Sequence, residues 1–89
     1  MPIVGLMSSS VYTSASVADT QRALSRVPSD ITVEVEDATG IVDGYYTAID
    51  IYSARPDAQR VILSSLAADG LHGRPFDDLE RESILTQQP

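Results

Sequence analysis

With 89 residues the chain is long enough for one small domain, so we expect a single domain over residues 1–89, with 1–2 and 87–89 as its candidate flexible ends. It has no cysteine, which excludes disulfides, thiolate metal sites and cysteine nucleophiles. Thirteen acidic residues outnumber six basic ones, all arginine, and the net charge of −7 disfavours binding to nucleic acid or to an anionic membrane.

The composition also bears on where the protein works. A lysine-free, acidic surface is typical of proteins from salt-adapted cells, so the acidity has two interpretations, a functional one and an environmental (halophilic) one. No stretch approaches the roughly 20 apolar residues of a membrane-spanning helix, and the apolar run at 2–7 is too short for a signal-peptide core. We therefore expect a soluble intracellular protein, in the cytoplasm or in a virion.

The N-terminal part predicts a strand followed by a helix. The apolar, β-branched run at 3–7 favours a strand that continues through Val11 and Tyr12, and a flexible tail is the alternative. A helix is expected over residues 17–27, with Ser16 as its N-cap and Asp19 in its first turn. Pro28 ends this helix. Its predicted buried face consists of Val17, Thr20, Leu24 and Val27.

Residues 31–53 are the centre of the predicted fold and are expected to form two antiparallel strands. In the first arm, apolar positions alternate with polar ones, as Ile31, Val33 and Val35 against Thr32, Glu34 and Glu36. The second arm alternates in the same way, as Tyr45, Thr47, Ile49 and Ile51 against Tyr46, Ala48, Asp50 and Tyr52. Both arms therefore have an apolar face and a solvated face that carries acids and tyrosines.

The turn between these arms has three interpretations. A two-residue turn at Asp43-Gly44 would face Ile49 away from Val33, so the alternation rejects it unless a bulge intervenes, and Gly40 is the one residue placed to supply that bulge. The alternatives are a tight loop at 38–40 and an open loop from 37 to 44. We favour one of these two loops.

A second helix is expected after the hairpin. Arg55-Pro56-Asp57 marks its start, because proline fits the first turn of a helix. Gly70 is placed for a C-terminal cap, with Leu71 packing back onto the helix. The predicted buried stripe is Ala58, Val61, Ile62, Ser65 and Leu66.

The C-terminal part has two interpretations. Residues 71–75 are predicted to be a loop, Phe76 and Leu79 fit helical spacing, and 83–87 fit an edge strand equally well. We assign a fourth strand near 81–87, because the order strand, helix, strand, strand, helix, strand is a common one. The predicted fold class is then an α+β two-layer sandwich with a ferredoxin-like β-α-β-β-α-β order and an antiparallel sheet. If the last element is a helix, the sheet has three strands.

Four residues of the central hairpin form the candidate interaction site: Glu34, Tyr46, Asp50 and Tyr52. The two tyrosines lie on the solvated face of the predicted sheet, where aromatic side chains can anchor a protein interface or stack on nucleobases. The glycine-aromatic signature and the basic flanks of RNA-binding sheets are missing. A protein partner or a second copy of the chain is therefore favoured, and nucleic acid is not.

No catalytic residue, cofactor or metal site is predicted. His72 lies in a loop where it could act as a base, but no partner residue is identifiable. The acids around the hairpin lack the spacing of a calcium loop, which favours a solvated acidic face.

The leading hypothesis is a non-catalytic protein-binding or assembly module, a small acidic subunit of a homo-oligomer or larger complex. Viral and phage structural components belong to this class. The alternative is a small oligomeric enzyme, or a ligand-binding regulatory domain, with a pocket at a subunit interface. Its candidate acid–base residues are Tyr46, Asp50, Tyr52 and His72.

Overall fold

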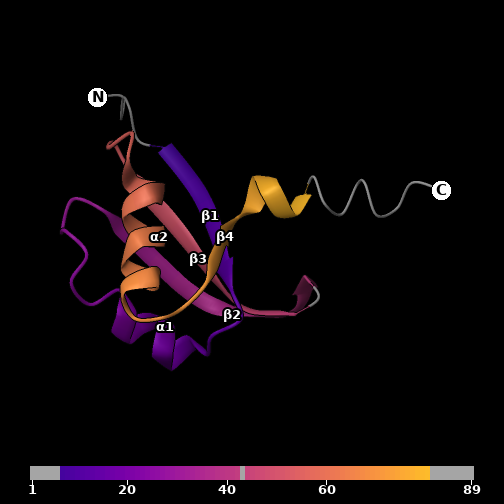
Figure 1. Cartoon of the computed structure of the whole chain (residues 1–89). Helices are drawn as coiled ribbons and strands as arrows, with labels where there is room; N and C mark the ends of the chain where they lie inside the picture. The colour runs from indigo at the N-terminus through magenta and orange to yellow at the C-terminus, as the bar shows by residue number, and fades with distance from the viewer. Residues whose placement is uncertain (1–6, 43, 81–89) are drawn as a thin grey trace.

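The computed structural model describes residues 7–42 and 44–80 and shows an α+β fold with one antiparallel four-stranded sheet (Figure 1). The sheet order is β2-β3-β1-β4. The α+β class and the antiparallel sheet are confirmed. In chain order the elements are β1 (Met7–Thr13), α1 (Val17–Ala23), β2 (Thr32–Val42), β3 (Tyr45–Ser53), α2 (Ala58–Ala68) and β4 (Gly73–Pro75), and residues 76–80 are again helical.

The predicted order strand, helix, strand, strand, helix, strand is found, but the arrangement differs from the ferredoxin-like prediction in the place of the last strand and in a third helical segment. The fourth strand, β4, has only three residues, lies in the segment predicted to be a loop, and pairs with β1 over Val11–Thr13. A third helical segment follows it at 76–80, in agreement with the helical spacing of Phe76 and Leu79. The strand assigned to 81–87 lies outside the described residues. Glycine and proline lower the strand propensity of 73–75, and backbone pairing with β1 overrides that propensity.

The beginning of the chain follows the prediction with one difference. The described part of the first strand continues through Val11 and Tyr12, and residues 3–6 lie outside the described ranges. Ser16 is confirmed as the N-cap of α1, because its hydroxyl accepts the backbone N–H of Asp19 at 3.1 Å. The helix ends at Ala23 rather than at residue 27. Ser25 donates its N–H and its hydroxyl to the carbonyl of Arg22, and this three-residue spacing tightens the chain into a turn.

The second helix, α2, is confirmed at both ends. It begins at Ala58 after the predicted Arg55-Pro56-Asp57 segment. At its C-terminus, the N–H of Gly70 donates to the carbonyl of Ala67, and the N–H of Leu71 donates to that of Leu66, both at 2.9 Å. These two bonds form a Schellman cap.

The main core lies between one face of the sheet and the two helices α1 and α2. The predicted apolar face of the central strands contributes Ile31, Ile49 and Ile51, and β1 contributes Val11. The helices contribute Ala23, Leu24, Ala58, Ile62 and Leu66. The apolar alternation therefore predicted correctly which face the helices cover.

The prediction that the apolar residues of the two arms share a face is confirmed, but the turn is not one of the two loops that we favoured. Val33 pairs with Ile51 and Val35 with Ile49, so these pairs lie on that shared face. The strands then meet again at the pair Val42–Tyr45, which corresponds to the two-residue connection at 43–44. Between Asp37–Thr47 and Val42–Tyr45, β2 has four residues (38–41) and β3 has one, so β2 is bulged. Gly40 lies in this bulge with a φ of 87°. A bulge at Gly40 was the one condition under which the alternation allowed a turn at Asp43-Gly44.

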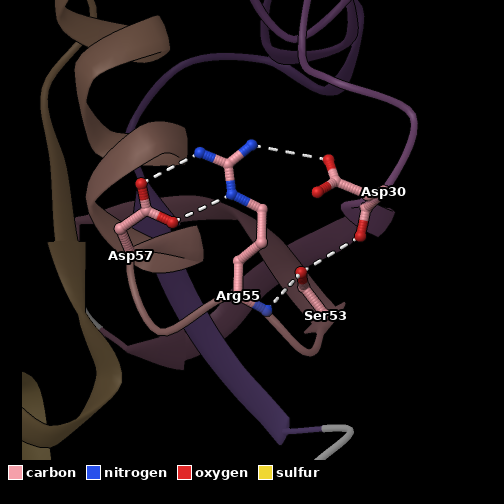
Figure 2. Close-up of polar contacts among 4 residues, drawn as sticks. All are labelled: Asp30, Ser53, Arg55 and Asp57. Atoms are coloured by element: carbon pink, nitrogen blue, oxygen red, sulfur yellow. Dashed lines mark hydrogen bonds and ion pairs between the residues drawn. The ribbon is translucent and has the colours of Figure 1, made fainter.

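Arg55 joins the loop before β2 to the start of α2 (Figure 2). Its Nε and Nη2 groups donate to the two carboxylate oxygens of Asp57, each at 2.9 Å, and Nη1 lies 3.5 Å from Asp30. The hydroxyl of Ser53 donates to the carbonyl of Asp30 and accepts the N–H of Arg55, both at 3.0 Å. The hydrogen bonds between them lower the pKa of Asp57 and raise that of Arg55.

Candidate functional site

The sheet face opposite α1 and α2 carries most of the predicted interaction site. Directly paired residues of antiparallel strands share a face, so the pairings define rows of side chains across the sheet. Three such rows run over β2, β3 and β1: Thr32–Tyr52–Ser8, Glu34–Asp50–Ser10 and Glu36–Ala48–Tyr12. We call this surface the polar sheet face. It brings together Glu34, Asp50 and Tyr52, three of the four predicted site residues.

The expectation that this face is solvated holds for only part of it. The helical segment 76–80 lies against it and buries Leu79 to 4% exposure in a second cluster with Tyr12, Ala38 and Ala48. Tyr45 packs against this cluster, although the alternation placed it on the apolar face. Tyr45 lies beyond Asp37–Thr47, the last pair of the regular register.

Asp50 is the centre of the polar part of this face. The hydroxyl of Ser10 donates to its carboxylate at 2.8 Å, across the β1–β3 pair. The carboxylate of Glu34 is the largest cause that raises the pKa of Tyr52, with smaller contributions from burial and from Asp50. Burial raises the pKa of Tyr12, and Asp50 adds to that shift. Nearby negative charge disfavours ionisation of both tyrosines.

A cavity of about 310 Å³ opens beside this part of the sheet. It lies at the start of β1, beyond the three residues that pair with β4. Two of the predicted site residues, Asp50 and Tyr52, line it. The other lining residues are Ser8, Ser9, Ser10, Gln59, Phe76 and Asp77.

Sequence reasoning missed these other lining residues. The register that places Ser10 opposite Asp50 depends on pairing between segments 40 residues apart, which the alternation within one strand does not reveal. Phe76 directly follows β4, which pairs with β1, and its ring centroid lies 5.7 Å from that of Tyr12. A run of three serines directly before a buried strand residue was the one local signal of this site.

The cavity is electronegative. It contains the carboxylates of Asp50 and Asp77. Within residues 7–42 and 44–80, the ion pairs are Asp19–Arg22, Asp30–Arg55 and Asp57–Arg55, so neither cavity carboxylate has a basic partner there. The same ranges contain no group of three or more His, Cys, Asp or Glu side chains placed to hold a metal ion.

The fourth predicted site residue, Tyr46, lies at the other end of β3. It lies six positions before Tyr52 along the strand, which corresponds to about 20 Å. It belongs to the end of the β2–β3 hairpin, residues 38–42 and 44–46, which we call the hairpin arm. Figure 1 shows this arm extending away from the part of the sheet that the helices cover. Ile41 and Tyr46 on it are 60% and 51% exposed.

The four residues named for an enzyme are not brought together. Asp50 and Tyr52 line the cavity, Tyr46 lies on the hairpin arm, and His72 is an exposed residue just before β4 that does not line the cavity. No helix in the described part of the chain is long and apolar enough to cross a membrane.

The described part of the chain thus has two distinct surface features, an electronegative cavity beside β1 and exposed apolar side chains on the hairpin arm. Comparisons of the chain with protein-family models, with curated proteins and with solved structures give no match.

Proposed function

We propose that this chain is a non-catalytic protein-binding or assembly module whose main contact surface is the hairpin arm. The observation that carries the proposal is the exposure of Ile41 and Tyr46, at 60% and 51% of their surfaces, on a part of the sheet that neither helix covers. Large apolar and aromatic side chains are typical of the centre of protein interfaces. A chain of this size also gains stability from association, because a small domain buries a limited apolar core.

The base of the arm is anchored, which supports its use as a defined surface. Ala38 is fully buried in the second cluster, and Tyr45 packs against that cluster. Asp37 accepts the backbone N–H of Thr39 at 2.8 Å and also its hydroxyl, so the chain turns in a fixed way as the bulge begins. The exposed side chains therefore extend from a backbone that is anchored at the base of the arm, and this anchoring reduces the conformational entropy lost when a partner binds.

Two features of β2 indicate that a partner contacts the hairpin arm and does not add a strand along the open edge of β2. β2 is an outer strand of the sheet, and strands with open edges invite pairing with other chains. Glu34 and Glu36 on the regular part of β2, and the bulge beyond it, are devices that oppose such pairing. A second copy paired through β2 would also bring like charges together.

The proposal is tested by measuring association of the purified chain with substitutions on the arm. Mass in solution is determined by light scattering over a range of protein and salt concentrations, and capture of host proteins is compared quantitatively between variants. We expect Tyr46→Ser and Ile41→Ser to abolish the association that the unchanged chain shows. Gln21→Ser, an exposed change on α1, is the control and leaves it intact.

Circular dichroism on each variant separates loss of contact from loss of fold. The proposal is wrong if the unchanged chain stays monomeric under all conditions and captures no protein whose recovery falls in the arm variants. It is also wrong if Gln21→Ser reduces association as much as Tyr46→Ser does.

A further inference from the structure

We propose that the cavity beside β1 is a subsite for the guanidinium group of an arginine side chain on a protein partner. The inference extends the proposed function. It depends on that function in one respect, namely that the arginine belongs to a protein partner. The cavity and the hairpin arm lie at opposite ends of β3, so variants of one leave the other in place.

The charge of the cavity calls for a cation. Asp50 comes from β3 and Asp77 from the helical segment after β4, and the fold brings both to the same cavity. Neither pairs with a basic side chain in the part of the chain that the structure describes. The chain as a whole carries a net charge of −7, which attracts a basic partner over a distance.

The hydrogen-bonding groups fit a ligand with several N–H donors. Guanidinium has five such donors and no acceptor. The Ser10 hydroxyl, by donating to Asp50 at 2.8 Å, holds one oxygen of that carboxylate and orients the other. Further acceptor oxygens on the cavity wall belong to Ser8, Ser9, Gln59 and Tyr52.

The aromatic wall distinguishes guanidinium from other cations. Phe76 lines the cavity and is 38% exposed, and its ring contacts that of Tyr12 with 5.7 Å between centroids. A planar guanidinium stacks on such a ring while it bonds carboxylates at its edge, and a compact, strongly hydrated ammonium is less suited to both tasks. A volume of about 310 Å³ is at the small end of ligand pockets, which suits one side-chain head group.

The test is a titration of the full-length chain, followed by ¹⁵N–¹H NMR, with the capped tripeptide acetyl-Gly-Arg-Gly-amide. We expect saturable shifts confined to the cavity residues. The same peptide with citrulline, which keeps the shape and loses the charge, is expected to cause none, and the lysine peptide to bind more weakly. Asp50→Asn and Asp77→Asn should each weaken arginine binding about fivefold or more, whereas Asp69→Asn, the same change at an exposed site outside the cavity, should not.

The proposal is overturned by the absence of cavity shifts with the arginine peptide, by equal shifts with arginine and citrulline, or by equal weakening by Asp69→Asn and the two cavity variants. Tighter binding of free L-arginine than of the capped peptide would also overturn it, because the ligand would then be a free amino acid. Tyr46→Ser is expected to bind the peptide normally, so failure of the arm as an interface is distinguishable from failure of the cavity.

Discussion

Ile49 and Ile41 are the same residue type on the same hairpin, and the structure gives them opposite environments. Ile49 is fully buried between the sheet and the helices, whereas Ile41 is 60% exposed on the hairpin arm. Burial of an isoleucine side chain contributes about 2 kcal/mol, and an exposed one contributes little to folding. Burial therefore accounts for Ile49, whereas Ile41 belongs to the surface for which we propose contact with a partner.

This difference gives the first prediction. Ile49→Ala is expected to lower the free energy of unfolding by about 2–5 kcal/mol, because it leaves a cavity in the core. The same change at the exposed site, Ile41→Ala, is expected to cost about 0.5 kcal/mol or less. Chemical denaturation of both variants checks this. Equal losses would show that the arm is buried against the body of the protein.

The second prediction concerns the pH dependence of the Asp57–Arg55 pair. Hydrogen bonds from Arg55 lower the pKa of Asp57 in the folded protein, so the folded state releases this proton more readily than the unfolded chain does. The resulting stabilisation is present above the unfolded pKa of about 3.9 and is lost as the pH falls through the lower folded pKa. We expect Asp57→Asn to reduce the melting temperature near neutral pH and to have a progressively smaller effect on acidification.

Asp69→Asn is the matched control for this measurement, because Asp69 is exposed and has no ion pair in the described part of the chain. Thermal unfolding of the three proteins across the acidic range gives the comparison. A difference between Asp57→Asn and the unchanged chain that stays constant down to the lowest pH would contradict the assignment.

At the scale of elements, β4 shows how a short segment with poor strand propensity becomes part of the sheet. It pairs with β1 through three residues and runs past the C-terminal half of α2. A Cβ at Gly73 would lie 2.7 Å from Cδ1 of Leu66 and 3.1 Å from Cγ1 of Val11. The absence of a side chain is what lets the strand approach the helix, and the helical segment 76–80 that follows β4 lies against the polar sheet face.

The third prediction follows from this close approach. Gly73→Ala is expected to destabilise the protein by about 1–3 kcal/mol, because Leu66 is fully buried and cannot move away without displacing the core. Because β4 leads directly to Phe76, the same change should also alter the NMR signals of the cavity residues. Urea denaturation and an NMR spectrum check the two effects. A neutral or stabilising result would mean that β4 does not pack against α2.

At the scale of the whole molecule, the sheet has an apolar cluster on each face and a strongly acidic surface around them. The larger cluster joins both helices to the sheet, and the smaller one joins the segment 76–80 to it. A net charge of −7 on a chain this small produces repulsion that opposes the compact state.

The fourth prediction is that moderate salt stabilises the folded chain. Raising sodium chloride from about 0.01 M to about 0.5 M shortens the range of repulsion between surface carboxylates, so the melting temperature near neutral pH should rise by a few degrees. The effect should be smaller near the isoelectric point of about 4.3, where the net charge vanishes. A melting temperature that falls with salt at neutral pH would show that attractive ion pairs dominate.

Local signals determined part of this fold without help from distant residues. Alternation within 31–36 and 45–52 predicted which residues of the two arms share a face, because side chains on a strand change face at every residue, and the pair Val33–Ile51 agrees with it. The Ser16 cap and the Gly70 cap were also predictable, since each satisfies backbone groups within a few residues of itself. The candidate residues Glu34, Asp50 and Tyr52 share a face for the same local reason.

Tertiary structure alone decided the rest. The bulge at 38–41 and the strand β4 depend on backbone pairing between separate segments. The free energy of that pairing cannot be inferred from the residue pattern of one segment alone. Leu79 packs on the second sheet face, and Phe76 and Asp77 line a cavity with Ser10 and Asp50, because they directly follow β4, which pairs with β1. The sequence by itself therefore determined which side chains share a face, and the long-range packing determined what covers each face and where a cavity forms.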